Sequence, residues 1–128
     1  MCIFITRTTL ATWIIKIADR LQALVNLIHE HIVQGDIIQM DETRIQVLSI
    51  PGKSAKSLSY MWVMVGGNLD HHAAVIFEFD PSRAGSVAKK LLEDFSGYLQ
   101  ADAYGGYNDV CKRDDIKRIG CLMHIRRD

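Results

Sequence analysis

The polar and apolar residues of this chain of 128 residues follow two different periods. Between residues 8 and 33, apolar side chains recur at steps of three and four, which is the spacing of one face of an α-helix. The positions of this stripe are Leu10, Ile14, Ile17, Leu21, Leu24, Ile28 and Ile32. We expect a long helix that begins at Thr8 or Thr9 and ends at Gly35 in the left-handed conformation.

Residues 37 to 48 show the period of two that is typical of a β-strand. Asp41 and Glu42 therefore point to opposite sides of the predicted strand. The side of Asp41 also carries Ile37, Gln39, Thr43, Ile45 and Val47. Because that side is largely apolar, we expect Asp41 to be a half-buried carboxylate, which needs a basic side chain, backbone donors or a metal ion nearby. The plain alternative is an edge-strand aspartate paired with a base.

The rest of the chain alternates between strand and helix patterns. The predicted elements are strands over residues 60–65 and 73–79, a helix over 80–95, a strand over 98–102, a helical turn over 110–113 and a strand over 116–122. This order is that of the ribonuclease H-like fold, with three antiparallel strands and then parallel strands joined by a crossover helix. We expect an α/β protein with such a mixed sheet, preceded by a long N-terminal helix.

Composition indicates the cellular location of the protein but does not indicate its function. Fifteen basic and fifteen acidic residues cancel, so the net charge favours neither nucleic acid nor membrane as a partner. The charge is uneven along the chain, with −4 over residues 61–110 and +3 over residues 111–128. Three widely spaced cysteines imply no disulfide framework, and no apolar run reaches the roughly 18 residues of a membrane span. We expect a cytoplasmic protein without a membrane partner.

Two aspartates are the candidates for chemistry. In a ribonuclease H-like sheet the first and fourth strands are neighbours, so Asp41 and Asp102 are expected side by side. Adjacent carboxylates repel each other unless a divalent cation lies between them, and oxygen ligands select Mg²⁺ or Mn²⁺. Two such ions activate a water or a 3′-hydroxyl for phosphoryl transfer. We therefore predict catalytic and metal-binding roles for Asp41 and Asp102.

Other kinds of site are less well supported by the residues. Cys111, Cys121 and His124 offer three zinc ligands without a convincing fourth. A sugar hydrolase would need a paired acid and base in an aromatic cleft, and neither pattern is present. Tyr104 and Tyr107 are candidates for stacking on bases, with core packing of at least one as the alternative.

Basic side chains are the candidates for DNA binding through phosphate contacts. The candidates are Arg83, Lys112, Arg113, Lys117, Arg118, Arg126 and Arg127. An ordinary solvated surface is an equally good interpretation of these residues.

A series of short motifs resembles the central region of insertion sequence 66 family transposases. The motifs are Thr6-Arg7-Thr8-Thr9-Leu10, Met40-Asp41-Glu42-Thr43, Tyr60-Met61-Trp62, Pro81-Ser82-Arg83-Ala84-Gly85, Gly97-Tyr98-Leu99, Asp102-Ala103-Tyr104-Gly105-Gly106-Tyr107, and Gly120-Cys121 with His124 and Arg126-Arg127. The resemblance covers nearly the whole chain. It implies a DDE transposase, a metal-dependent enzyme that cuts and joins the DNA ends of a mobile element. Asp41 and Asp102 would be its first two acidic residues.

The chain departs from the family pattern in one respect. A third acidic residue, usually a glutamate, is expected on a helix after the fifth strand, but the last glutamate is Glu93. The upstream DNA-binding region of the family is also absent. We therefore expect a fragment truncated at the C-terminus, with an N-terminal helical segment over residues 1–35 and an incomplete catalytic core over residues 36–128. We expect no transposition activity from it alone. The alternative is a non-enzymatic remnant that only binds DNA or other transposase chains.

Overall fold

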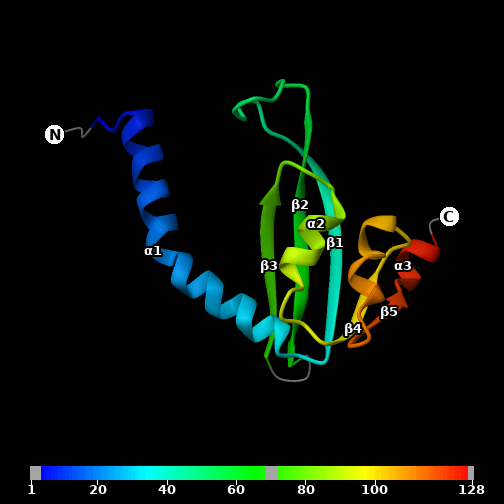
Figure 1. Cartoon of the computed structure of the whole chain (residues 1–128). Coiled ribbons are helices and arrows are strands. Elements are labelled where there is room, and N and C mark those ends of the chain that lie inside the picture. Colours follow the sequence, from blue (N-terminus) through cyan, green and yellow to red (C-terminus); the bar gives the residue numbers. More distant parts are fainter. Residues whose placement is uncertain (1–3, 69–71, 127–128) are drawn as a thin grey trace.

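A five-stranded mixed sheet forms the centre of the computed structural model, which describes residues 4–68 and 72–126 (Figure 1). Its elements are α1 (Arg7–Val33), β1 (Ile37–Gln46), β2 (Leu58–Asn68), β3 (His72–Asp80), α2 (Gly85–Leu91), β4 (Gly97–Ala101), the 3-10 turns η1 (Gly105–Tyr107) and η2 (Val110–Lys112), β5 (Ile116–Gly120) and α3 (Leu122–Ile125). Across the residues so described, every helix is too short or too polar to cross a membrane.

The strand order of the sheet is β3-β2-β1-β4-β5. The first three strands pair antiparallel with their sequence neighbours. β4 then pairs parallel with β1, and β5 pairs parallel with β4. A parallel pair needs a crossover connection, and α2 lies in the connection that leads from β3 to β4. The prediction of an α/β protein with a long N-terminal helix and a mixed sheet is confirmed.

The predicted ends of the first helix are wrong, although the helix itself is confirmed. Its N-cap is Thr6, which has extended backbone angles and accepts a hydrogen bond from the Thr9 amide at 3.1 Å. Gln34 ends the helix, and Gly35 does not adopt the left-handed conformation. A glycine is needed at position 35 for another reason. A Cβ atom there would lie 2.6 Å from the carbonyl oxygen of Gly67, so β2 approaches the backbone directly.

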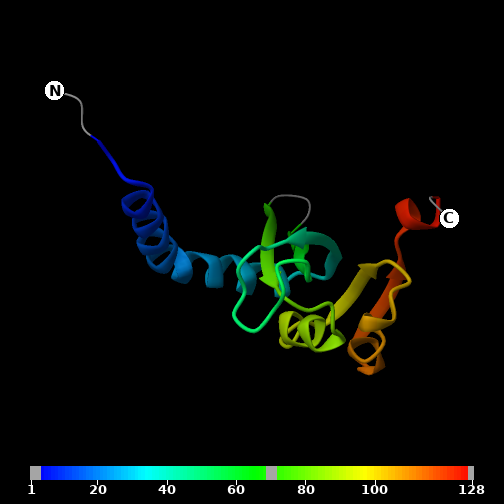
Figure 2. The same ribbon diagram turned by 90° about the horizontal axis from the view of Figure 1, so that it is seen from above.

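Only the C-terminal third of α1 packs against the sheet. Ile32 is fully buried, and Val25, Ile28 and Val33 contact the core. The earlier positions of the apolar stripe, Leu10, Ile14, Ile17, Leu21 and Leu24, are 46% to 69% exposed. Figure 2 shows this part of α1 projecting away from the sheet. The stripe therefore predicts the helix correctly, but the described residues leave most of it exposed.

The two faces of the sheet differ in burial. One face packs against α2 and the end of α1, and its buried residues include Ile38, Met40, Trp62, Met64 and Leu99. The other face leaves Val75, Phe77 and Phe79 exposed. Alternation along β1 places Asp41 on the uncovered face and Glu42 on the covered one.

The prediction that Asp41 is a half-buried carboxylate is therefore wrong. The Asp41 side chain is 55% exposed and that of Glu42 is 1% exposed. Both sides of β1 carry apolar residues, so the sequence pattern did not decide which side would be covered. The packing of α2 and α1 onto the Ile38 and Met40 side decided it.

The second helix is shorter than predicted at both ends. It starts at Gly85, and neither Asp80 nor Ser82 caps it. Their side chains instead accept hydrogen bonds from the backbone amides of Ser82 and Ala84 within the preceding loop. After the helix, the guanidinium of Arg113 donates to the carbonyl groups of Leu92, Glu93 and Phe95. An arginine twenty residues away thus satisfies the carbonyls of this non-helical segment.

The uneven burial of α1 predicts different effects on stability for two matched substitutions in this helix. Ile32→Ala removes a fully buried side chain and is expected to lower the free energy of unfolding by about 2–5 kcal/mol. Ile14→Ala, at a site that is 69% exposed, is expected to change it by less than about 0.5 kcal/mol, because alanine also favours the helix. Urea unfolding followed by circular dichroism measures both. Equal losses would show that the first half of α1 contributes to the folded core.

Candidate functional site

The parallel ladder between β1 and β4 places Asp41 beside Asp102. Its register pairs Gln39 with Gln100, and each aspartate lies two residues further along the chain, Asp41 within β1 and Asp102 directly after β4. Because side chains alternate, both carboxylates belong to the face that carries the two glutamines. The structure thus brings together the two residues that the sequence analysis selected.

The imidazole of His124 is the third side chain at this place. One donor atom each from Asp41, Asp102 and His124 lies within 4.8 Å of the other two. The distance from His124 Nε2 to Asp41 Oδ2 is 3.6 Å. Among residues 4–68 and 72–126, no further carboxylate and no cysteine belongs to this group. Sequence reasoning considered His124 only as a zinc ligand with the cysteines, because nothing local shows that α3 returns to β1.

Backbone hydrogen bonds fix α3 against the end of β4. The amide of Cys121, which precedes α3, donates to the carbonyl of Ala101, which precedes Asp102, at 3.1 Å. Hydrogen bonding to the side chain and backbone of His124 lowers the pKa of the Cys121 thiol. The backbone next to Asp102 and the backbone at the start of α3, which carries His124, are therefore joined by a hydrogen bond that continues the pairing of β4 with β5.

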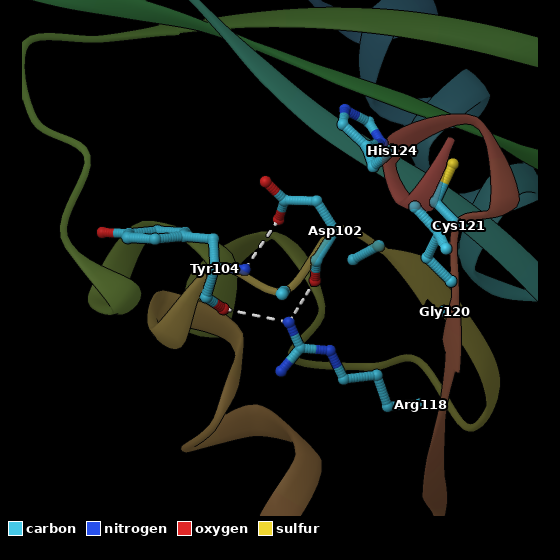
Figure 3. Close-up of a pocket in the computed structure, with 9 residues that line it drawn as sticks. Asp102, Tyr104, Arg118, Gly120, Cys121 and His124 are labelled. Atoms are coloured by element: carbon cyan, nitrogen blue, oxygen red, sulfur yellow. Dashed lines mark hydrogen bonds between the residues drawn. The ribbon is translucent and has the colours of Figure 1, made fainter. Parts of the chain in front are cut away.

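An open pocket of about 710 Å³ lies beside these side chains. Figure 3 shows its lining, with the Asp102 carboxylate and the His124 ring on the same side of it. Asp102 Oδ1 accepts a hydrogen bond from the Tyr104 amide at 3.0 Å. Arg118 donates to the carbonyls of Asp102 and Tyr104 and to the Asn108 side chain. The loop after Asp102 is thus ordered by its own contacts.

An ion pair between the buried Glu42 and the partly exposed Arg83 lies directly behind the site. Glu42 accepts hydrogen bonds from Arg83 Nε at 2.7 Å and from the Tyr107 hydroxyl at 2.6 Å, and a second Arg83 nitrogen lies 2.5 Å away. The Arg83 guanidinium also sits 3.8 Å from the centroid of the Tyr104 ring. Glu42 follows Asp41 in sequence, and both tyrosines follow Asp102. The network therefore ties the two segments that carry the aspartates.

The hydroxyl of Tyr107 is a fixed donor in this network. Tyr107 is fully buried and its ring makes edge contacts with Trp62 and Tyr104. Burial, and then the hydrogen bond to the Glu42 carboxylate, raise the pKa of Tyr107 far above its usual range. The sequence analysis missed this role. Its available signal was that Glu42 shares a strand side with Ile38 and Met40, where a carboxylate needs partners.

The predicted DNA-binding residues fall into two groups. The guanidinium groups of Arg83, Arg113 and Arg118 are engaged inside the protein, as described above, so their first role in the structure is to hold loops. Lys112 is exposed and pairs with Asp109 at 2.7 Å, and Lys117 and Arg126 are also exposed. Arg127 lies outside the described residues. DNA contact by any of these residues stays a prediction.

Comparisons with known proteins agree on one family. A profile described as the transposase IS66 family matches residues 2–128. Two uncharacterized proteins of Sinorhizobium fredii match this chain. The protein y4qI is 26% identical over 96% of the chain, and y4jD is 27% identical over 98% of it. The chain spans about a quarter of the length of these relatives, 25% and 26% respectively. No solved structure matches it.

The buried hydroxyl of Tyr107 generates a prediction with a defined pH dependence. Tyr107→Phe removes a hydrogen bond to a buried carboxylate and should lower the free energy of unfolding at pH 7 by about 1–3 kcal/mol. An unfolded tyrosine titrates near pH 10, whereas folded Tyr107 keeps its proton to higher pH. Its contribution is therefore complete below about pH 10 and is lost as the pH rises toward the folded pKa.

Wild type should consequently lose stability above pH 10 more steeply than Tyr107→Phe, by up to about 1.4 kcal/mol per pH unit. Tyr98→Phe, at a side chain that is 46% exposed, is the matched control and should keep the wild-type slope. Denaturant unfolding between pH 8 and about 11 measures the slopes. Identical slopes for wild type and Tyr107→Phe would contradict the assignment.

Proposed function

This chain belongs to the transposase IS66 family, and we propose that it supplies two metal-binding carboxylates for DNA strand cleavage and strand transfer. The observation that carries the proposal is the position of Asp41 on β1 beside Asp102, which directly follows the neighbouring parallel strand β4. They are also the first two acidic residues that the family resemblance selects.

The donor set fits a divalent cation. Two carboxylates with donor atoms within 4.8 Å of each other repel in the absence of a cation. Asp41 lies on the uncovered face of the sheet, so a cation and a phosphate group can both reach it. We propose Mg²⁺ or Mn²⁺, bound by Asp41 and Asp102. A bound cation would supply charge stabilisation for the phosphoryl group and a lowered pKa for the attacking hydroxyl.

The residues of the chain have separate tasks in this proposal. Asp41 and Asp102 hold the cation from opposite strands of one ladder. Glu42 connects β1 to the loop before α2 through Arg83 and to η1, after β4, through Tyr107, because a carboxylate buried at 1% exposure is stable only when such donors satisfy it. Arg118 keeps the loop that begins at Asp102 in place.

We also propose that the fold is ribonuclease H-like. The support is the strand order β3-β2-β1-β4-β5, with three antiparallel strands followed by two parallel ones. The position of one aspartate within β1 and the other directly after β4 agrees with that assignment. The division of the chain at residues 35 and 36 stays a prediction.

DNA is the proposed substrate, and the cytoplasm is the proposed location. Lys112, Lys117 and Arg126 are exposed bases near the end of the described chain, and we propose them as phosphate contacts. We also propose other transposase chains as partners.

We also propose a second candidate function. The described group of ligands contains no glutamate, and the last glutamate of the sequence, Glu93, precedes Asp102. We therefore propose that these residues alone do not catalyse strand transfer. The alternative is a non-enzymatic remnant that binds DNA or other transposase chains.

Titration with Mn²⁺ tests the metal proposal. Asp41→Asn and Asp102→Asn should each weaken Mn²⁺ binding at least about tenfold, which corresponds to about 1.4 kcal/mol, because each removes one charged ligand. Asp19→Asn, at an exposed position of α1, is the matched control and should bind as wild type does. Isothermal titration calorimetry measures all four proteins. Equal binding by wild type and both site variants would exclude the proposed centre.

Salt dependence tests the DNA proposal. Lys117→Ala and Arg126→Ala should weaken binding to duplex DNA of any sequence, and each should reduce the slope of log K against log salt by about one. Lys16→Ala, on the projecting part of α1, serves as the control for loss of one positive charge. Fluorescence anisotropy from about 50 to 200 mM salt measures the slopes. Unchanged slopes would assign these side chains to an ordinary solvated surface.

A further inference from the structure

We propose that His124 is a direct ligand of the divalent cation held by Asp41 and Asp102. The inference rests on the proposed function and makes it more specific, because a nitrogen donor changes which cations the site prefers. It starts from the finding that an imidazole occupies the third position beside the two carboxylates.

The spacing of the donor atoms fits a single ion. In octahedral coordination with bonds of about 2.0–2.2 Å, neighbouring donors lie about 3 Å apart and opposite donors about 4.3 Å apart. The 3.6 Å from His124 Nε2 to Asp41 Oδ2 falls between these values. The 4.8 Å limit for the whole group exceeds the larger value by less than a bond length. Small side-chain rotations would therefore bring all three donors onto one cation.

The fold holds His124 at this place. β5 runs parallel to β4, with Gly120 in register with Ala101. The chain then turns at Cys121 into α3, which carries the imidazole back to the end of β4 and to the Asp41 position in the middle of β1. Amide hydrogen bonds from Cys121 to Ala101 and from His124 to Cys121 fix this turn, each at 3.1 Å. Hydrogen bonding that involves His124 also lowers the pKa of the Cys121 thiol.

The chemical consequence is a change in cation preference. Carboxylate and water ligands suit Mg²⁺, Ca²⁺ and Mn²⁺, whereas imidazole adds affinity for Mn²⁺ and later transition metals. A site of two carboxylates and one imidazole should therefore bind Co²⁺ and Mn²⁺ more tightly than Mg²⁺. A site that consists of Asp41 and Asp102 alone should discriminate less.

The test compares three cations on matched histidine variants. His124→Asn should weaken binding of Co²⁺ and Mn²⁺ at least about tenfold and of Mg²⁺ less than about threefold. His72→Asn is the control, since His72 is exposed on β3. Across the sheet, Asp41 pairs with Val63, and Val63 pairs with Phe77. His72 lies five residues before Phe77 on β3, which displaces it from the level of Asp41 by about 16 Å along the strand. Calorimetry with the metal salts alone gives the dissociation constants.

A measurement on wild type avoids dependence on the folding of a variant. One equivalent of Co²⁺ should produce a strongly shifted imidazole N–H signal in the proton NMR spectrum, and His124→Asn should abolish it while His72→Asn keeps it. Absence of that signal, or equal losses for all three cations, would overturn the ligand assignment. If the aspartate variants lose binding but His124→Asn does not, the assignment fails and the proposed function stands. If wild type binds none of the cations, both fail.

Discussion

The parallel pairing of β1 with β4 is the constraint on which the candidate site depends. The ladder has three register pairs and ends at Gln39 and Gln100, just before the two aspartates. A slip of one residue would move Asp102 to the covered face of the sheet, because successive side chains alternate. The register is protected on that face by Ile38 and Leu99, which are both fully buried. Hydrophobic packing on the covered face thus determines which carboxylates lie side by side on the uncovered face.

The buried pair of Glu42 and Arg83 adds a second constraint of a different kind. A carboxylate with 1% exposure is costly unless charged and neutral donors satisfy it. Those donors come from the loop before α2 and from η1, so the network can form only when three separate segments are correctly placed. Two adjacent acidic residues on β1 consequently have different environments. The Asp41 side chain faces solvent, and the Glu42 side chain faces the interior.

The described residues leave two apolar surfaces uncovered. One is the first part of the α1 stripe, and the other is the sheet face around Val75, Phe77 and Phe79. Folded proteins usually bury contiguous surfaces of this kind. Asp41 shares the uncovered sheet face, so the candidate metal site and the exposed apolar row of β3 belong to one surface. Whatever contacts this face also approaches the two carboxylates.

The sequence by itself determined the elements and the identity of the two aspartates. Local period and turn chemistry predict α1, the three-stranded meander and the short strand before Asp102, because these depend on residues close in the chain. The predicted ends of α1 and α2 were wrong: Thr6, not Thr8 or Thr9, caps α1, and the carbonyls of the segment after α2 bind the distant Arg113 in place of continuing the helix. Tertiary structure alone decided which face of β1 is buried, that Glu42 binds Arg83 and Tyr107, and that His124 joins Asp41. The last two findings join residues that are more than forty positions apart in the sequence, and only the packed sheet brings these residues together.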